Sequence, residues 1–362
     1  MPKAPQPSGE RAAGGLIPVS SSHLVSWAVL VGIGALLLLF ASSDLGELWR
    51  VTTAINPVLL VVPFFFALAS YVTMSLSYAG ISHAAGARVP FWEMFKVTIV
   101  GNTVNYIVTT GGLSGFAVRM YFFIRMGVPS GTAVIISLIQ TFITNVVLLL
   151  CVVFGFGYLL LSHEVEGVVF GAMAAFLAVS VLATTIALML LWNRRLRRRT
   201  LFVLAEMSNA FMHRFMPARK PARVKIWRFQ RNLNRGIEFL MRRKRHMIMP
   251  TLWIVGDWAA TIMILHSAFW IIGAPVALSI VIVGFSIGIV LSFVSFVPGG
   301  LGIMEGSMAA IFVSLAVPLE SAVVAVLIFR IAYYFMPMVI SVFFFRNMLV
   351  QGTRQAEESA GE

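Results

Sequence analysis

Long uninterrupted apolar stretches constrain the fold of this chain more than any other feature of its sequence. A helix of about 20 apolar residues crosses a hydrocarbon core about 30 Å thick. Several windows meet this criterion: Leu24–Ala41, Pro57–Ala79, Gly131–Leu161, Val168–Trp192, Met247–Ile272, Val276–Val297 and Ser321–Phe345. Only 11% of the 362 residues are charged, against roughly 25% in soluble domains. The sequence therefore predicts an all-α, polytopic membrane helix bundle with about 6–8 spans.

Positive charge is concentrated in one segment of the chain. The net charge is +13, and residues 193–246 hold 17 Lys and Arg against two acids, so the remainder sums to −2. Because cytoplasmic loops carry an excess of Lys and Arg, we expect this segment to be cytoplasmic, and counting crossings places both termini on the same side. No nucleic-acid-binding motif accompanies the charge, so we expect the partners to be anionic lipid headgroups and not nucleic acid. Candidate headgroup contacts are Arg125, Arg194, Arg195, Arg197 and Arg198.

This topology divides the chain into three parts. We expect a cytoplasmic tail at residues 1–22, an integral membrane domain at 23–348 and a cytoplasmic tail at 349–362. Within the basic segment 193–246, apolar residues recur at helical spacing, Leu233 and Ile237 among them. The spacing predicts two amphipathic helices at the cytoplasmic interface, broken around "MPARKPAR". A small solvated domain is the alternative.

The sequence offers little for redox, metal or covalent chemistry. Cys151 is the single cysteine and lies within a predicted span, and the histidines are scattered. The chain has no Walker loop, no nucleophile elbow and no paired-carboxylate pattern of a glycosidase. We therefore expect no catalytic residues, no cofactor and no metal.

Two segments of the chain resemble each other. "GGLSGFAVRMYFFIRMGVPSGTAVIISLIQ", Gly111 to Gln140, aligns with "GGLGIMEGSMAAIFVSLAVPLESAVVAVLIF", Gly299 to Phe329, with one inserted residue. Gly-Gly-Leu, Val-Pro and Ala-Val occur in the same order in both. Counting crossings places the approach to the first Gly-Gly on the cytoplasmic side and the approach to the second on the other side. We therefore expect an inverted repeat, an architecture of secondary transporters in which Gly-rich breaks mark the binding site.

Each copy predicts a re-entrant hairpin that turns at its Gly-Gly pair. The expected hairpins are Phe91–Thr110 with Ser114–Met126 and Val276–Val297 with Gly302–Ala316. Backbone groups released at such turns cannot face lipid, so the turns must be buried in protein or line a wet cavity. The alternative for residues 276–316 is two ordinary crossings.

Charged residues at membrane depth are the candidate site residues, because they are costly there unless paired or hydrated. They are Asp257, Glu305, Arg330, Arg119 and Arg125. The Gly-Gly turns would add backbone N–H groups and helix N-termini, which bind anions; the turn residues concerned are Gly111, Gly112, Pro298, Gly299, Gly300 and Gly302.

Each charged candidate also has a structural interpretation. Arg119 and Arg125 would simply extend to the cytoplasmic surface. Glu305 would lie in the first turn of a helix, where an acid is favourable. Arg330 would form a structural ion pair with Asp257 or with Glu305.

These motifs resemble a known family. "PGGLGIMEG" followed by "AVVAVLIFRIAYYFMPMVI", together with "TTGGLSGFAVRMYFFIRMGVPSGTAV", is similar to the integral-membrane region of bacterial lysylphosphatidylglycerol synthases, which stand-alone flippase-like proteins share. The similarity runs from about Ser22 to Met348. The second motif has the family's residues at the matching positions, Glu305 and Arg330 included. The first motif departs, because Phe116 and Ala117 occupy the place of the family's acid.

The resemblance implies a lipid-handling role. In the two-domain synthases this region moves an aminoacylated phospholipid between leaflets, and a separate soluble domain performs the aminoacyl transfer. We therefore expect a transporter of the bacterial inner membrane and no enzyme activity, with an anionic or zwitterionic phospholipid or a polyprenyl-phosphate-linked lipid as cargo. Arg119 and Arg330 would bind phosphate, and Glu305 and Asp257 would supply counter-charge or carry a proton. The alternative is a membrane scaffold that recruits a glycosyltransferase or lipid-modifying enzyme.

Overall fold

The computed structural model describes residues 41–108, 113–162, 167–193, 244–294 and 297–344, with isolated positions within 33–39, 195–203 and 231–238. Every regular element in this part of the chain is helical, as predicted. The α-helices are α2 (Leu45–Thr53), α3 (Val61–Ala84), α4 (Phe91–Ile107), α5 (Leu113–Arg125), α6 (Ser130–Ser162), α7 (Gly167–Trp192), α10 (Ile248–Ile271), α11 (Leu278–Val294), α12 (Ile303–Ser314) and α13 (Leu319–Arg330). Short 3₁₀ turns occur at Pro57–Leu60, Lys244–Met247 and Pro298–Gly300, and a π-helical segment follows α13 at Ile331–Phe335.

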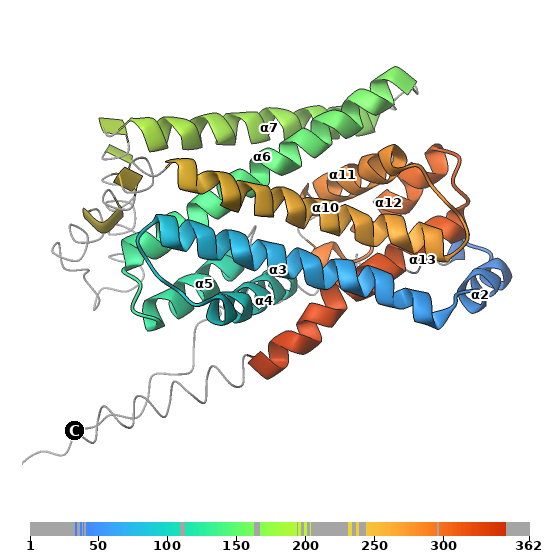
Figure 1. Ribbon diagram of the computed structural model, residues 1–362. Helices are drawn as coiled ribbons and strands as arrows, with labels where there is room; N and C mark the ends of the chain where they lie inside the picture. The colour runs from blue at the N-terminus through green and yellow to red at the C-terminus, as the bar shows by residue number, and fades with distance from the viewer. Residues whose placement is uncertain are drawn as a thin grey trace, which may run out of the picture.

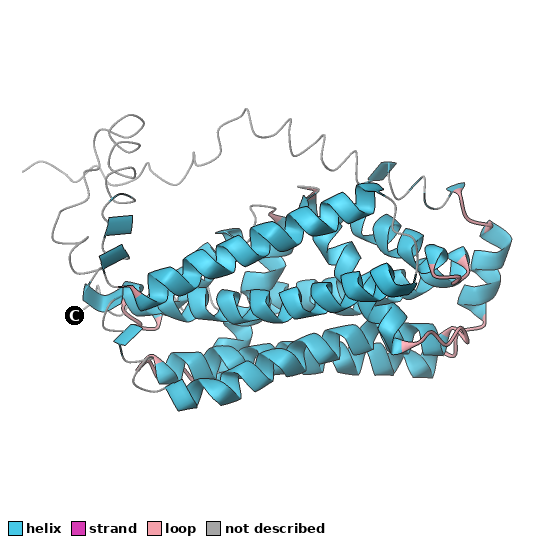
Figure 2. Cartoon of the chain, turned by 90° about the horizontal axis from the view of Figure 1, so that it is seen from above, coloured by secondary structure: helices cyan, strands magenta, loops and turns pink. Residues whose placement is uncertain are grey.

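Four of the described helices are long and apolar enough to cross a membrane, namely Pro57–Ala84, Ser130–Tyr158, Arg245–Ile271 and Leu319–Phe344. They run lengthwise through the bundle, with α3 and α10 side by side at its centre (Figures 1 and 2). A Cβ on Gly80 of α3 would lie only 2.7 Å from Cγ of Pro250, so glycine is what allows α3 and α10 to approach. The predicted window Leu24–Ala41 falls mostly outside the described residues.

Two pairs of shorter helices complete the bundle. Helices α4 and α5 pack together in the left half of Figure 1, and α11 and α12 pack together in the right half. In the first pair a Cβ on Gly115 would lie 2.6 Å from the carbonyl oxygen of Gly101. In the second pair Gly284 and Gly288 receive the side chains of Phe312 and Met308. Small residues therefore set the spacing of both pairs, as is usual between helices in membranes.

The two pairs end in the same local geometry. The N–H of Val128 donates to the carbonyl of Phe123 across the end of α5, and the N–H of Val317 donates to the carbonyl of Phe312 across the end of α12, both at 2.9 Å. The preceding residue has a left-handed backbone in each case, with φ of 77° at Gly127 and 62° at Ala316. This is the Schellman helix end. A proline then precedes the next long helix in both copies.

The basic segment contacts the membrane helices where it is described. Leu233 and Ile237, predicted to form an apolar face, are buried in a cluster with residues of α3, α4, α5 and α6. A Cβ on Gly131 of α6 would lie 2.6 Å from the backbone nitrogen of Leu233, so the glycine permits this contact. Of the other predicted headgroup contacts in this segment, Arg195 is described, and Arg194, Arg197 and Arg198 lie outside the described residues.

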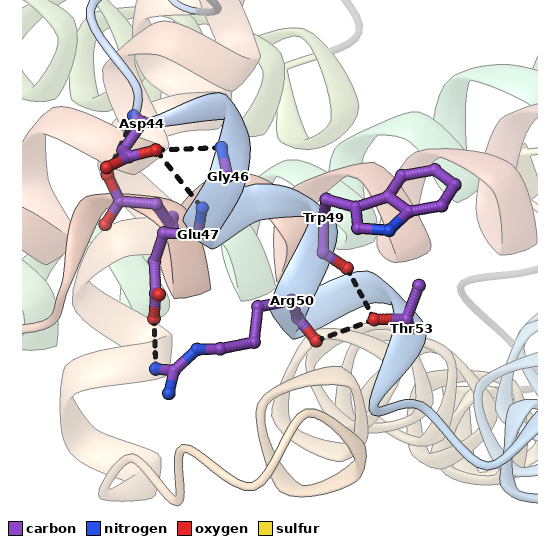
Figure 3. Close-up of polar contacts among 7 residues, drawn as sticks. Asp44, Gly46, Glu47, Trp49, Arg50 and Thr53 are labelled. Atoms are coloured by element: carbon purple, nitrogen blue, oxygen red, sulfur yellow. Dashed lines mark hydrogen bonds and ion pairs between the residues drawn. The ribbon is translucent and has the colours of Figure 1, made fainter.

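Helix α2 lies at the right end of the bundle in Figure 1 and packs against α13. Asp44 caps its N-terminus by accepting hydrogen bonds from the backbone N–H groups of Gly46 and Glu47, and Arg50 pairs with Glu47 on its exposed face (Figure 3). Leu48 is buried, whereas Leu45 and Trp49 are exposed. An amphipathic helix with an outward tryptophan is typical of the membrane–water interface.

Candidate functional site

The second Gly-Gly motif forms a tight turn between α11 and α12. Gly299 and Gly300 both have φ of 61°, and Gly302 has φ of 77°, a region that residues with a Cβ rarely adopt. A Cβ on Gly300 would also collide with Oγ of Ser292 at 2.0 Å. The turn therefore requires glycine for both backbone conformation and space, as its sequence predicted.

Arg330 is held by this turn and by Glu305. Its Nε lies 2.7 Å from Oε1 of Glu305, and its Nη2 donates to Oε2 of Glu305 at 3.0 Å. Nη1 donates to the carbonyl of Gly299 at 2.6 Å, and Nη2 also donates to the carbonyl of Gly300 at 3.0 Å. Glu305 lies in the first turn of α12. Of the two ion pairs considered from the sequence, the structure forms the one with Glu305.

The ring of Tyr334 lies over the Arg330 guanidinium. Its Cζ lies 4.4 Å from the ring centroid of Tyr334, the geometry of a cation–π contact. Tyr334 belongs to the π-helical segment Ile331–Phe335, which begins directly after Arg330. Single π turns within α-helices are frequent at functional sites. The segment also presents Tyr333, whose backbone carbonyl accepts a 3.3 Å hydrogen bond from the hydroxyl of Tyr71.

The end of α4 meets the second Gly-Gly turn. A Cβ on Gly299 would lie 3.4 Å from the carbonyl oxygen of Tyr106, and the rings of Tyr106 and Tyr334 are 4.4 Å apart. Gly111 and Gly112, the first Gly-Gly pair, lie outside the described residues. The last turn of α4 and the second turn are therefore adjacent, although about 190 residues separate them in sequence.

Arg119 occupies a different setting on α5. Its side chain is only 8% exposed, so it points into the protein and does not extend to the surface. Nη1 donates to Oδ1 of Asn102 on α4 at 3.1 Å, and Cζ lies 5.6 Å from the ring centroid of Tyr78 on α3. Nε is buried without a hydrogen-bond partner. Across the described ranges no carboxylate lies within ion-pairing distance of Arg119.

Asp257 belongs to α10, and its carboxylate faces α3. It makes no direct contact with Arg119 or Arg330 among the described interactions. It is 5% exposed, and its Oδ1 accepts a 2.5 Å hydrogen bond from Oγ of Ser70. Oγ of Ser70 lies 3.1 Å from Oγ1 of Thr261. Within the part of the chain that the structure describes, no Lys or Arg pairs with Asp257. The structural ion pair between Asp257 and Arg330 is therefore not formed.

Two further sequence candidates, among the described residues, lie at the surface. Arg125 is exposed at the end of α5, with Cζ 5.4 Å from the ring of Tyr121, and Arg195 is also exposed. No group of His, Cys, Asp and Glu among the described residues is suited to hold a metal ion. The sequence analysis did not single out the tyrosines at positions 71, 78, 106, 333 and 334. Three of them are close to a motif in sequence: Tyr106 precedes the first Gly-Gly pair, and Tyr333 and Tyr334 follow Arg330.

Comparison with known proteins identifies the family. Residues 25–341 match the family described as the lysylphosphatidylglycerol synthase TM region. The phosphatidylglycerol lysyltransferase of Staphylococcus haemolyticus is 35% identical over 85 residues, and that of Staphylococcus aureus is 34% identical over the same length. These matches span 24% of this chain and only 10% of each relative. The chain is thus a multi-pass membrane protein that belongs to the lysylphosphatidylglycerol synthase TM region family.

Proposed function

We propose that this protein moves a lipid with an anionic or zwitterionic headgroup between the two leaflets of a bacterial inner membrane. The observation that carries the proposal is the set of charged side chains buried within the bundle: Arg330 and Glu305 beside the second Gly-Gly turn, and Arg119 and Asp257 elsewhere between the helices. Charged groups inside membrane proteins are expensive, and they commonly line the route of a polar substrate. A lipid has a polar headgroup and apolar acyl chains. A path lined by buried charges would carry the headgroup while the acyl chains stay in the membrane.

The proposed architecture is an inverted repeat with two re-entrant hairpins, α4 with α5 and α11 with α12. The placement of the pairs in opposite halves of the bundle supports it. The proposed orientation puts the basic segment 193–246 and both termini in the cytoplasm, because of its excess of Lys and Arg. The pairs would then enter from opposite sides and meet near Tyr106 and Gly299.

The proposed cargo is a phospholipid such as phosphatidylglycerol or its derivatives, or a polyprenyl-phosphate-linked lipid. The matched relatives are named for a reaction on phosphatidylglycerol, and an arginine in the bundle suits a phosphate group. Asp257, buried beside Ser70, would supply counter-charge or carry a proton during movement.

A translocation assay tests this function. Purified protein is reconstituted into vesicles that contain fluorescent phosphatidylglycerol, and dithionite quenching reports the lipid that reaches the outer leaflet. We expect faster loss of protected fluorescence than in protein-free vesicles, and slower loss with Arg119→Gln. Wild-type vesicles that behave like protein-free vesicles with every phosphate-bearing lipid tested would refute the proposal.

A scaffold is the second candidate. The observation that favours it is that the basic segment is fixed to the bundle through Leu233 and Ile237, which would present the arginines at one end. A glycosyltransferase or lipid-modifying enzyme would bind there. Co-purification of such an enzyme with the intact chain, but not with Leu233→Asp, would support the scaffold, and recovery of equal amounts with both would refute it.

A further inference from the structure

The two buried arginines differ in the acceptors that surround them. A guanidinium has five N–H donors and no acceptor. Arg330 directs its nitrogens at Glu305 and at the carbonyls of Gly299 and Gly300. Among the described residues, Arg119 has one hydrogen-bond acceptor, Oδ1 of Asn102. The Nε atoms of both arginines lack an aligned hydrogen bond, but that of Arg330 lies 2.7 Å from a Glu305 oxygen, whereas no described carboxylate pairs with Arg119. Among the described residues, Arg119 is therefore a buried cation with N–H donors that have no acceptor.

The groups around Arg119 are short of acceptors as well. The amide nitrogen of Asn102 points at Sδ of Met74, 3.0 Å away, and a thioether is a weak acceptor. Tyr78 offers the face of its ring to the guanidinium and not a negative charge. Among the described residues, no anion therefore receives the remaining donors of Arg119 and Asn102.

Burying a cation without a counter-charge is costly. The cost is removed when an anion with several acceptor oxygens completes the site, and a phosphate is suited to the fork of a guanidinium. We propose that Arg119, Asn102 and Tyr78 form a subsite for the phosphate of a lipid headgroup, whereas Arg330 holds the second turn in place. This subsite rests on the proposed function for the identity of its ligand, a phospholipid.

Gly101 makes room at the subsite. A Cβ on Gly101 would lie 3.0 Å from Cγ and 3.3 Å from Nη1 of Arg119. The stem of Arg119 therefore lies across the backbone of α4, and the guanidinium is directed toward Asn102 and Tyr78. This placement is imposed by the close crossing of α4 and α5 at Gly115, so the cation is positioned before any ligand arrives, which lowers the cost of binding.

Binding to the purified full chain, measured without transport, tests the subsite. The delipidated protein in detergent is titrated with short-chain phosphatidylglycerol and with diacylglycerol of the same chains, and binding is followed by native mass spectrometry. We expect Arg119→Gln to weaken phosphatidylglycerol binding by roughly 10-fold to 100-fold, the range for charge-assisted hydrogen bonds, and to leave diacylglycerol binding unchanged. Arg119→Lys should lie between, because it keeps the charge and loses the fork.

Arg88→Gln is the control. Arg88 is an exposed arginine in the connection between α3 and α4. We expect Arg88→Gln to bind phosphatidylglycerol as the wild type does. Equal affinities for wild type and Arg119→Gln, or equal losses in Arg119→Gln and Arg88→Gln, would overturn the proposal. If Arg119→Gln does not fold, Asn102→Ala replaces it, with a loss of a few-fold expected and wild-type affinity counting against the subsite.

Inorganic phosphate distinguishes the two sources of the ligand. We expect it to compete with phosphatidylglycerol on the wild type only at concentrations far above those of the lipid, since the lipid also gains from its chains. Tight phosphate binding that Arg119→Gln abolishes, with no preference for phosphatidylglycerol over diacylglycerol, would refute the lipid assignment. A chain that binds phosphatidylglycerol through Arg119 but moves no lipid would refute the proposed function and leave the subsite standing.

Discussion

Arg330 and Arg119 are equally buried, each 8% exposed, yet their surroundings differ. Arg330 lies against a carboxylate, two backbone carbonyls and a tyrosine ring. Arg119 has an amide oxygen and a tyrosine ring. Since the two side chains are equally buried, they differ in whether a protein carboxylate neutralises the positive charge. A cation that the protein itself neutralises can serve structure, and one that it does not neutralise is available to a ligand.

Removing the compensating carboxylate should have the largest effect. Glu305→Gln leaves Arg330 buried without a counter-charge, and we expect a loss of about 3–5 kcal/mol in the free energy of unfolding. Denaturation in detergent micelles measures it. Glu320→Gln on α13 is the control, since among the described residues its carboxylate accepts one hydrogen bond, from the backbone N–H of Asp44 at 3.3 Å. A loss in Glu305→Gln no greater than in Glu320→Gln would show that Arg330 needs no partner.

Adding a carboxylate at Arg119 should make the first site resemble the second. Oδ1 of Asn102 already accepts from Arg119, so Asn102→Asp creates an ion pair with almost no change in shape. We expect the affinity for phosphatidylglycerol to fall by roughly 10-fold or more, because the protein then neutralises its own cation. Asn105→Asp, one turn further along α4, is the comparison. Unchanged affinity in Asn102→Asp would mean that Arg119 binds no anion.

The close glycine contacts of both helix pairs should resist an added side chain. Gly115→Ala drives a Cβ toward the carbonyl oxygen of Gly101 at 2.6 Å, and Gly288→Ala drives one to 2.3 Å from Cγ of the buried Met308. We expect each variant to cost about 1–3 kcal/mol of unfolding free energy. Gly306→Ala, with open space around the added Cβ, is the reference in the same denaturation series. A Gly115→Ala variant as stable as Gly306→Ala would argue against a rigid α4–α5 crossing.

The smallest effect is expected at the matching helix ends. Ala316 adopts a left-handed backbone that alanine disfavours, and Gly127 adopts it in the other copy. We expect Ala316→Gly to raise and Gly127→Ala to lower the free energy of unfolding, each by roughly 1 kcal/mol. Thermal unfolding of both variants measures this. Changes of the same sign would show that the two ends are not equivalent.

Sequence patterns predicted the structural features that depend on residues close together in the chain. Apolar length gave the helical bundle, and the Pro-Gly-Gly motif gave the turn at Gly299, because few residues other than glycine adopt its backbone. From the sequence, either Asp257 or Glu305 was the expected partner of Arg330. The structure pairs it with Glu305, because α12 is rotated about its axis so that Glu305 faces α13. No hydrophobic period in the sequence specifies this rotation.

The setting of Arg119 was not predictable for the same reason. From the sequence, an arginine near the end of a membrane segment extends to the surface as readily as it turns inward. The close crossing of α4 and α5 at Gly101 and Gly115 turns it inward. Tyr78 and Asn102 reach it from two other helices, and long-range contacts between three elements leave no periodic signal in the chain. The π-helical segment after Arg330 likewise has no local sequence signature.

The position of a bound lipid tests the difference between the two arginines most directly. An experimental structure of the protein in nanodiscs that contain phosphatidylglycerol would show where the headgroup phosphate lies. We predict phosphate density within about 4 Å of the Arg119 guanidinium, close enough for an ion pair, with the ion pair between Arg330 and Glu305 intact. Phosphate at Arg330, with Glu305 displaced and Arg119 unoccupied, would contradict the account.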